Sequence, residues 1–227
     1  MNMTSQKIAQ IDTSYYDADR VEMLEYINRR DIRILDIGCG TGKFGQMIMQ
    51  KRNAEVWGIE IEPKIAAIAT KSLHKVLCGN AEELIFDLPD NTFDLICFND
   101  SLEHLLWPEQ MLQHCKTKLR DEGEILCSLP NMRYFRIIFD LVFKKKWEYE
   151  DAGILDKTHL RFFTINSIKN MFQRSGYTIT VLEGNQAKSR ARTKSWRYRI
   201  FQILTFGNAE DMRHGQFHIK ANLANNR

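Results

Sequence analysis

The feature that most constrains the fold is an alternation of short apolar runs with helical patterns along the first 130 residues. The apolar runs have strand length and cover residues 32–37, 55–60, 75–79, 93–99 and 124–129. Helical spacing occupies residues 43–52, 63–73 and 105–120. A continuously apolar strand is covered on both faces, and helical crossovers join parallel neighbours. The pattern therefore predicts an α/β fold, in which a doubly wound, mostly parallel sheet carries helices on both faces.

The segments around this core predict further elements. Val21, Leu24 and Ile27 recur at helical spacing, which indicates an N-terminal cap helix over residues 14–30. Residues 131–163 form an insertion with an amphipathic stretch and a loop of charged and aromatic residues. The remaining pattern predicts a helix over 164–175, a strand over 177–183, a basic helix near 195–206 and a last strand over 216–223.

Length and composition favour one domain. The chain has 227 residues, of which 44% are hydrophobic and 27% charged, and no linker rich in Pro, Gly or Ser interrupts the pattern. We therefore expect a single domain over 1–227, with the basic helix and last strand in residues 188–223. The five cysteines form no CxxC pair, and we see neither an apolar run of about 20 residues nor a signal peptide. These features predict a reduced, cytoplasmic protein.

Charge is distributed unevenly. Residues 188–227 hold nine basic and two acidic groups, whereas the whole chain has a net charge of only +3. This asymmetry suggests an anionic partner for the C-terminal segment.

A glycine cluster, Asp36-Ile37-Gly38-Cys39-Gly40-Thr41-Gly42, follows the first predicted strand and opens a helix. In a doubly wound sheet such a loop lies at the carboxyl ends of the strands, where ligands bind. Glu60 ends the second strand, where a carboxylate can accept hydrogen bonds from ribose. The dinucleotide pattern G-x-G-x-x-G needs glycine at position 43, which is Lys43. Asp36 would repel a pyrophosphate and favours a cationic ligand instead.

The segments LDIGCGTG and GIEIEP resemble motif I and the acidic loop of class I S-adenosylmethionine (SAM) methyltransferases, over about residues 15–182. The resemblance implies a Rossmann-like, seven-stranded sheet with an antiparallel last strand, and SAM as cofactor. By position it places Asp36 and the glycine loop on the methionine portion, Glu60 on the ribose and Asn80 on the adenine. A plain turn at Asn80 is an equal alternative. The full predicted cofactor set is Tyr16, Asp36, Gly38, Cys39, Gly40, Gly42, Glu60, Ile61, Asn80, Ala81 and Asn99.

His104, after the fourth predicted strand, is the first candidate for a catalytic base, since a hydroxyl acceptor must lose a proton during methyl transfer. A Glu-His pair recurs here in many methyltransferases of this type. Asp100, Glu103 and His104 have the spacing of one helical face, and the similar ubiquinone-pathway O-methyltransferases use a metal there. We nevertheless predict no metal, because acidic residues at a helix start also suit the helix dipole.

The second candidate segment is GILDKTHLRFFT, residues 153–164, which is similar to the DRTHLRFFT segment of a methyltransferase subfamily common near surface-glycan genes. It offers His159 as a base and Arg161 as an anchor for an anionic acceptor, with Tyr149 upstream as a further acceptor contact. The alternative is that His159 and Arg161 only fix the insertion by buried hydrogen bonds. For Tyr16 two predictions are equally supported: an aromatic residue of a lid that closes over SAM, or a tyrosine of the core.

These features predict transfer of a methyl group to a small-molecule or glycan-precursor acceptor, with oxygen favoured. An RNA methyltransferase remains an alternative because Lys188, Arg190, Arg192, Lys194, Arg197 and Arg199 are interleaved with aromatic residues. Nucleic acid is disfavoured, since the fourth strand ends in Asn-Asp-Ser-Leu rather than in the Asn-Pro-Pro-Tyr type of motif. A SAM-binding protein without catalysis is the other alternative. Residues 132–146 also show an interfacial pattern, so a weak membrane-surface contact stays open beside a lid over the acceptor.

Overall fold

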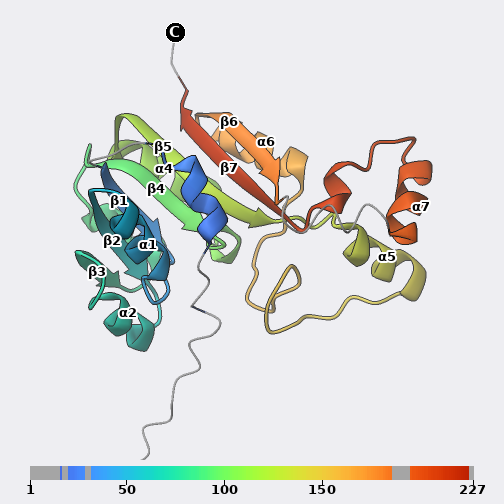
Figure 1. Ribbon diagram of the computed structural model, residues 1–227, viewed down its shortest axis with the longest axis horizontal. Coiled ribbons are helices and arrows are strands. Elements are labelled where there is room, and N and C mark those ends of the chain that lie inside the picture. Colours follow the sequence, from blue (N-terminus) through green and yellow to red (C-terminus); the bar gives the residue numbers. More distant parts are fainter. Residues whose placement is uncertain (1–15, 17–19, 29–31, 186–194, 225–227) are drawn as a thin grey trace, which may run out of the picture.

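The computed structural model describes residues 16, 20–28, 32–185 and 195–224 and shows one seven-stranded sheet (Figure 1). The strands are β1 (Ile32–Ile37), β2 (Ala54–Glu60), β3 (Lys75–Cys78), β4 (Phe93–Asn99), β5 (Leu119–Pro130), β6 (Tyr177–Gly184) and β7 (Gln216–Leu223). Their order is β3-β2-β1-β4-β5-β7-β6. The first five strands pair in parallel, and β7 lies antiparallel between β5 and β6. The predicted fold class is confirmed, including the antiparallel last strand.

Helices cover both faces of the sheet. In the described residues the α-helices are α1 (Lys43–Lys51), α2 (Pro63–Ala69), α3 (Ala81–Leu84), α4 (Pro108–Lys118), α5 (Phe135–Lys144), α6 (Ile165–Arg174) and α7 (Trp196–Leu204). Short 3-10 turns are η1 (Val21–Tyr26), η2 (Ile85–Asp87), η3 (Leu102–His104) and η4 (Asp211–Arg213). One buried cluster joins α4 and α6 to the sheet, and another joins η1 and α1 to the opposite face. Two apolar layers therefore hold the sheet, as continuously apolar strands require.

The N-terminal segment differs from the prediction. In place of a cap helix over 14–30, the described part holds only η1, a six-residue 3-10 turn that begins after Arg20. Met23, Leu24 and Ile27 are buried, whereas Val21, at the start of the turn, is exposed. The rest of the predicted cap helix lies outside the described residues, apart from residues 16, 20, 27 and 28.

The sheet order reverses between β1 and β4, which is where a doubly wound sheet forms its ligand crevice. Asp36 near the end of β1 lies opposite Gly58 of β2 and Cys97 of β4. The carboxyl ends of these three central strands therefore meet at one edge. All five cysteines are free, and among the described residues no helix has the length and apolar character needed to cross a bilayer.

Candidate active site

A cavity of about 840 Å³ opens at the carboxyl ends of β1, β2 and β4. This volume lies within the range of small-molecule sites. The structure brings to its wall nearly the whole cofactor set that the sequence predicts, namely Tyr16, Asp36, Gly38, Cys39, Gly40, Glu60, Ile61, Asn80, Ala81 and Asn99. Gly42 is not among the described lining residues. It ends the loop at a positive φ of 82° and precedes α1, so it shapes the loop instead of lining it.

The glycine loop is held against Glu60. The Gly40 amide donates to Oε2 of Glu60 at 2.9 Å, and the Glu62 amide donates to Oε1 at 3.0 Å. Gly40 has a φ of +54°, and a Cβ there would lie 2.5 Å from the carbonyl oxygen of Tyr16. A side chain at position 40 is therefore excluded by both conformation and space. Glu60 is buried, and it fixes the loop while it faces the cavity.

Asp36 and Asn99 place polar atoms in the cavity wall without partners. Asp36 is 2% exposed, and its Oδ1 has no hydrogen-bond partner among the described residues; the same holds for both amide atoms of Asn99. Burial and then the charge of Glu60 raise the pKa of Asp36 to about 7. A buried carboxylate without a partner is costly, and a cationic ligand with hydrogen-bond donors would relieve that cost. The cationic amino-acid end of SAM fits this donor and acceptor set.

Asn80 serves as a helix cap in the cavity wall. Its Oδ1 accepts a hydrogen bond from the Glu82 amide at 2.9 Å, so it starts α3. The turn role and a ligand contact are compatible here, because Asn80 caps the helix and also lines the cavity.

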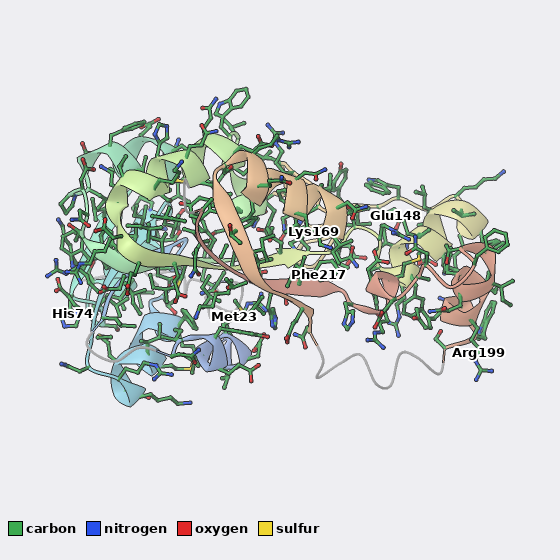
Figure 2. The ribbon with its side chains drawn as sticks, turned by 90° about the horizontal axis from the view of Figure 1, so that it is seen from above. Met23, His74, Glu148, Lys169, Arg199 and Phe217 are labelled. Atoms are coloured by element: carbon green, nitrogen blue, oxygen red, sulfur yellow. The ribbon has the colours of Figure 1, made fainter. Side chains whose placement is uncertain are left out.

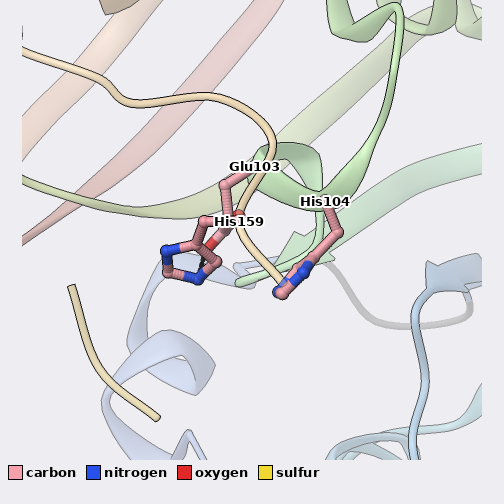
Figure 3. Close-up of side chains that lie close together, drawn as sticks. All are labelled: Glu103, His104 and His159. Atoms are coloured by element: carbon pink, nitrogen blue, oxygen red, sulfur yellow. Dashed lines mark ion pairs between the residues drawn. The ribbon is translucent and has the colours of Figure 1, made fainter. Parts of the chain in front are cut away.

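His104 and His159 meet in the same cavity, although they are 55 positions apart in the sequence (Figure 3). Their ring centroids are 4.8 Å apart at an interplanar angle of 68°. Glu103 completes the group, with its Oε1 at 3.8 Å from Nε2 of His159. The sequence alone does not identify Glu103 as a partner of His159, because that pairing depends on how the insertion folds back.

Backbone carbonyls orient both imidazole rings. Nδ1 of His159 lies 3.1 Å from the Ile154 carbonyl oxygen, and Nδ1 of His104 lies 3.2 Å from the Thr158 carbonyl oxygen. A carbonyl only accepts, so in each ring Nδ1 carries the proton and Nε2 keeps the lone pair of the neutral form. Burial, and next the neighbouring His159, lower the pKa of His104. Both features favour a neutral ring that can accept a proton at Nε2.

Glu103 is 1% exposed, and neither carboxylate oxygen has a hydrogen-bond partner among the described residues. Burial raises its pKa to about 8. Once ionised it would stabilise an imidazolium at His159. One potential ligand atom from each of Glu103, His104 and His159 lies within 4.8 Å of the others, so these three could also hold a divalent cation.

The structure does not assemble the group Asp100, Glu103 and His104 that the helical spacing indicates. Asp100 has a positive φ of 53°, and η3 begins only at Leu102, so the three residues share no helical face. The Asp100 carboxylate instead accepts from the Ser128 hydroxyl and the Gln216 amide, and it forms an ion pair with Arg20. This network joins the N-terminal segment to β5 and β7 at the cavity wall.

A turn within the insertion and two backbone hydrogen bonds hold it against η3. Oδ1 of Asp156 accepts from the Thr158 amide at 2.7 Å and the Thr158 hydroxyl at 2.6 Å, which closes a tight turn immediately before His159. The Leu160 and Arg161 amides both donate to the Glu103 carbonyl oxygen, at 2.9 Å and 3.0 Å. The order Asp-x-Thr is a sequence signal for such a turn, and it explains how His159 reaches Glu103.

The two predicted acceptor contacts lie elsewhere. The Arg161 guanidinium donates to the Leu106 and Leu160 carbonyl oxygens, so in the described structure it ties the insertion to the loop after η3. Tyr149 is 58% exposed. Neither is among the described residues that line the cavity. In the basic run, Lys188–Lys194 falls outside the described residues, whereas Arg197 and Arg199 lie on α7.

A model of the methyltransferase domain family matches residues 9–182. Among curated proteins, the chain is 27% identical over 126 residues to a ubiquinone biosynthesis O-methyltransferase of Pseudomonas fluorescens, which covers 52% of this chain and 53% of that protein. It is 26% identical over 106 residues to phosphoethanolamine N-methyltransferase 2 of Caenorhabditis elegans, which covers 44% of this chain and 24% of that protein. The chain thus spans about half the length, or less, of these two relatives.

Solved structures agree on the fold. A SAM-dependent methyltransferase from Archaeoglobus fulgidus matches with a TM-score of 0.64 at 20% identity, over 88% of this chain and 91% of that chain. At this identity the likeness concerns the fold alone. The family match covers the glycine loop, Glu60, His104 and His159, which are the residues that build the cavity wall.

Proposed function

The chain belongs to the SAM-dependent methyltransferases of the methyltransferase domain family, and from this premise we propose that it methylates a hydroxyl group of a small-molecule or glycan-precursor acceptor. The observation that carries the proposal is the histidine pair. His104 and His159 line the same cavity as Asp36 and Glu60, so a candidate proton acceptor lies in the cavity that we propose for the cofactor. Transfer to an amine can rely on orientation and desolvation, whereas a hydroxyl needs a base.

SAM supplies an electrophilic methyl group on a sulfonium. The protein must align the acceptor oxygen with that methyl and take up the hydroxyl proton as the new C–O bond forms and the S–C bond breaks, which leaves S-adenosylhomocysteine. Nε2 of His104 or His159 is the proposed proton acceptor, because carbonyl contacts at Nδ1 leave Nε2 with its lone pair. An ionised Glu103 at 3.8 Å from Nε2 of His159 would stabilise the resulting imidazolium.

The acceptor class is inferred from the insertion. Residues 153–164 resemble a segment found in methyltransferases encoded near surface-glycan genes, and Gly153, Ile154, Asp156, Thr158, His159 and Leu160 line the cavity. The segment that carries the resemblance thus lines the cavity, which supports an acceptor of this class. We infer that sugar hydroxyls, presented on nucleotide or lipid carriers, are the acceptors to test first. For Arg161 or Tyr149 to bind the acceptor, the half-buried Arg161 side chain or the exposed Tyr149 side chain would have to turn toward it.

The histidine assignment is tested with methyl-labelled SAM and a panel of nucleotide-sugars and polyprenyl-linked sugars. We expect His104→Ala or His159→Ala to lower the turnover rate by about 10²–10⁴-fold while the dissociation constant of SAM is unchanged, since neither ring belongs to the cofactor wall. His114→Ala, on the outer side of α4, is the matched control and should keep full activity.

Two outcomes would overturn the base assignment. If both histidine variants keep the wild-type rate, orientation alone carries the catalysis. If EDTA abolishes activity and a divalent cation restores it, Glu103, His104 and His159 act as metal ligands instead. Our expectation is that activity survives EDTA.

A further inference from the structure

Helices α5 and α7 form a small unit of their own at one end of the molecule, beside the edge that carries β6 and β7 (Figures 1 and 2). Their shared core is separate from the two clusters that hold the sheet. It consists of Tyr134, Phe135, Phe139, Tyr198, Phe201, Ala209 and Met212. The Phe139 ring also contacts Phe143 and Trp196 at centroid distances of 4.7 Å and 5.4 Å. Two helices from distant parts of the chain thus hold each other while their other faces remain open.

These open faces expose large apolar side chains. Of the sixteen exposed large hydrophobic side chains in the described chain, seven belong to α5, α7 and the turn after α7, namely Leu141, Val142, Phe143, Trp196, Ile203, Leu204 and Phe206. Ile203 is 76% exposed and Phe206 is fully exposed. Exposed apolar side chains gathered on one unit mark a contact surface, whereas scattered ones need no explanation.

The same segments are strongly basic. Helix α5, helix α7 and the turn after α7 (135–144 and 196–207) hold four basic side chains and one acidic side chain, a net charge of +3, and Lys145 and Lys146 follow α5 directly. Arg136 and Arg199 are exposed, and the Arg197 guanidinium lies 4.6 Å from the centroid of the Phe139 ring. Aromatic and aliphatic side chains flanked by Lys and Arg are typical of helices that lie at a membrane interface.

We propose that α5, α7 and the turn after α7 dock onto a membrane surface that contains anionic lipids. A second copy of this chain fits the face less well, because two such faces would bring together two net positive charges. A nucleic acid would match the charge but not Leu141, Val142, Ile203 and Leu204, since aliphatic side chains offer bases no stacking surface. Anionic lipid matches the charge and the apolar side chains together.

The docking face is connected to the active site. The chain runs from the end of α5 at Lys144 directly into the loop whose residues Ala152, Gly153 and Ile154 line the cavity. The loop between α5 and α6 therefore joins the docking face to the cavity wall. Insofar as the proposed function is right, this arrangement suits an acceptor sugar carried on a membrane lipid; the docking itself does not depend on that function.

The test measures binding of the full chain, without SAM or acceptor, to phosphatidylcholine vesicles with and without phosphatidylglycerol. We expect binding only to the anionic vesicles, with an affinity that falls as salt rises. Ile203→Ser combined with Phe206→Asn should weaken it by about ten-fold or more. Arg136→Gln combined with Arg199→Gln should weaken it by about 25-fold, at about five-fold per basic side chain. All four side chains are exposed, so we expect these variants to fold.

Matched controls are Phe86→Ser, an exposed apolar side chain on η2, and Lys51→Gln combined with Lys64→Gln on α1 and α2. They should bind vesicles like the wild type. Equal binding of all variants, or no binding to anionic vesicles, would overturn the proposal. Self-association or RNA binding that the α5–α7 variants abolish, without vesicle binding, would assign the face to those partners. Vesicle binding by a protein that methylates none of the tested acceptors would refute the proposed function and leave the docking intact.

Discussion

Asp36 links the protonation state of the cavity to cofactor binding. Its pKa of about 7 lies above the ordinary carboxyl value, so in the free protein the group is largely neutral below pH 7. A cationic ligand prefers the ionised form, and binding below pH 7 must therefore release a proton. We expect the affinity for SAM to rise by up to about ten-fold per pH unit up to pH 7 and to level off above it, as measured by calorimetry.

Asp36→Asn is the matched control for this dependence, because it keeps the shape of the side chain and removes the titration. The variant should bind SAM more weakly than the wild type at pH 8 and show an affinity that does not change between about pH 6 and 8. A wild-type affinity that is equally flat, or one that falls as pH rises, would contradict the role given to Asp36.

At the scale of single residues, the sequence best predicts those cavity residues that end a central strand. Asp36 and Glu60 were predictable cavity residues because each belongs to the end of a central strand, and parallel strands present those ends at one edge. Glu103 was not predictable as a partner of His159, and Arg20 was not predictable as a partner of Asp100. Both contacts join segments that are far apart in sequence and need the folded loops to bring them together.

At the scale of elements, the loop before α6 determines where the histidine pair lies. The turn closed by Asp156 places Thr158, whose carbonyl oxygen orients His104, and it leads directly to His159. We expect Asp156→Ala to lower the turnover rate by about 10–10²-fold through misplacement of both rings, while the affinity for SAM is unchanged. Loss of two half-buried hydrogen bonds should also reduce the free energy of unfolding by about 1–3 kcal/mol.

Asp151→Ala is the control from the same loop. Asp151 is exposed, and its described contact is an ion pair with the exposed Lys157. It should leave both the rate and the unfolding free energy within about 0.5 kcal/mol of the wild type. If the Asp156 and Asp151 variants behave alike, the turn does not position the histidines.

Element boundaries followed the sequence closely where a local signal fixes them. Thr164 caps α6 and forms a capping box with Ser167, and Pro108 starts α4 three residues later than the apolar pattern indicates. β4 and β7 have the predicted limits. The N-terminal turn and the pairing of α5 with α7 were not predictable, because helical spacing alone cannot tell a 3-10 turn from an α-helix or identify the partner of an apolar face.

On the scale of the whole molecule, the two ends of the cavity have different origins. The wall proposed to hold the cofactor comes mainly from the ends of β1, β2 and β4, whereas the proposed acceptor side comes from the loop between α5 and α6. A sheet edge is rigid and its geometry follows from strand order, while a long insertion can vary without disturbing the sheet. This division explains why the sequence specifies the cofactor more firmly than the acceptor.

The final prediction concerns stability in the presence of ligands. A ligand that binds only the native state stabilises it by RT ln(1 + [L]/Kd), which is about 2.7 kcal/mol at a hundred-fold excess over Kd. For a chain of this size that corresponds to a rise in melting temperature of about 5–10 °C with SAM or S-adenosylhomocysteine. NAD should produce no shift, because Lys43 replaces the last glycine of the dinucleotide pattern and Asp36 opposes a pyrophosphate.

Glu60→Ala should remove most of that rise at the same SAM concentration, since it removes the ribose acceptor and the anchor of the Gly40 amide. The loss of charge-assisted hydrogen bonds corresponds to about 1.5–3 kcal/mol of binding energy. Glu55→Ala, on the same strand but paired with Arg33 away from the cavity, should keep the full shift. Stabilisation by NAD without stabilisation by SAM would overturn the cofactor assignment, because the glycine loop and Glu60 would then hold a ligand of the opposite charge.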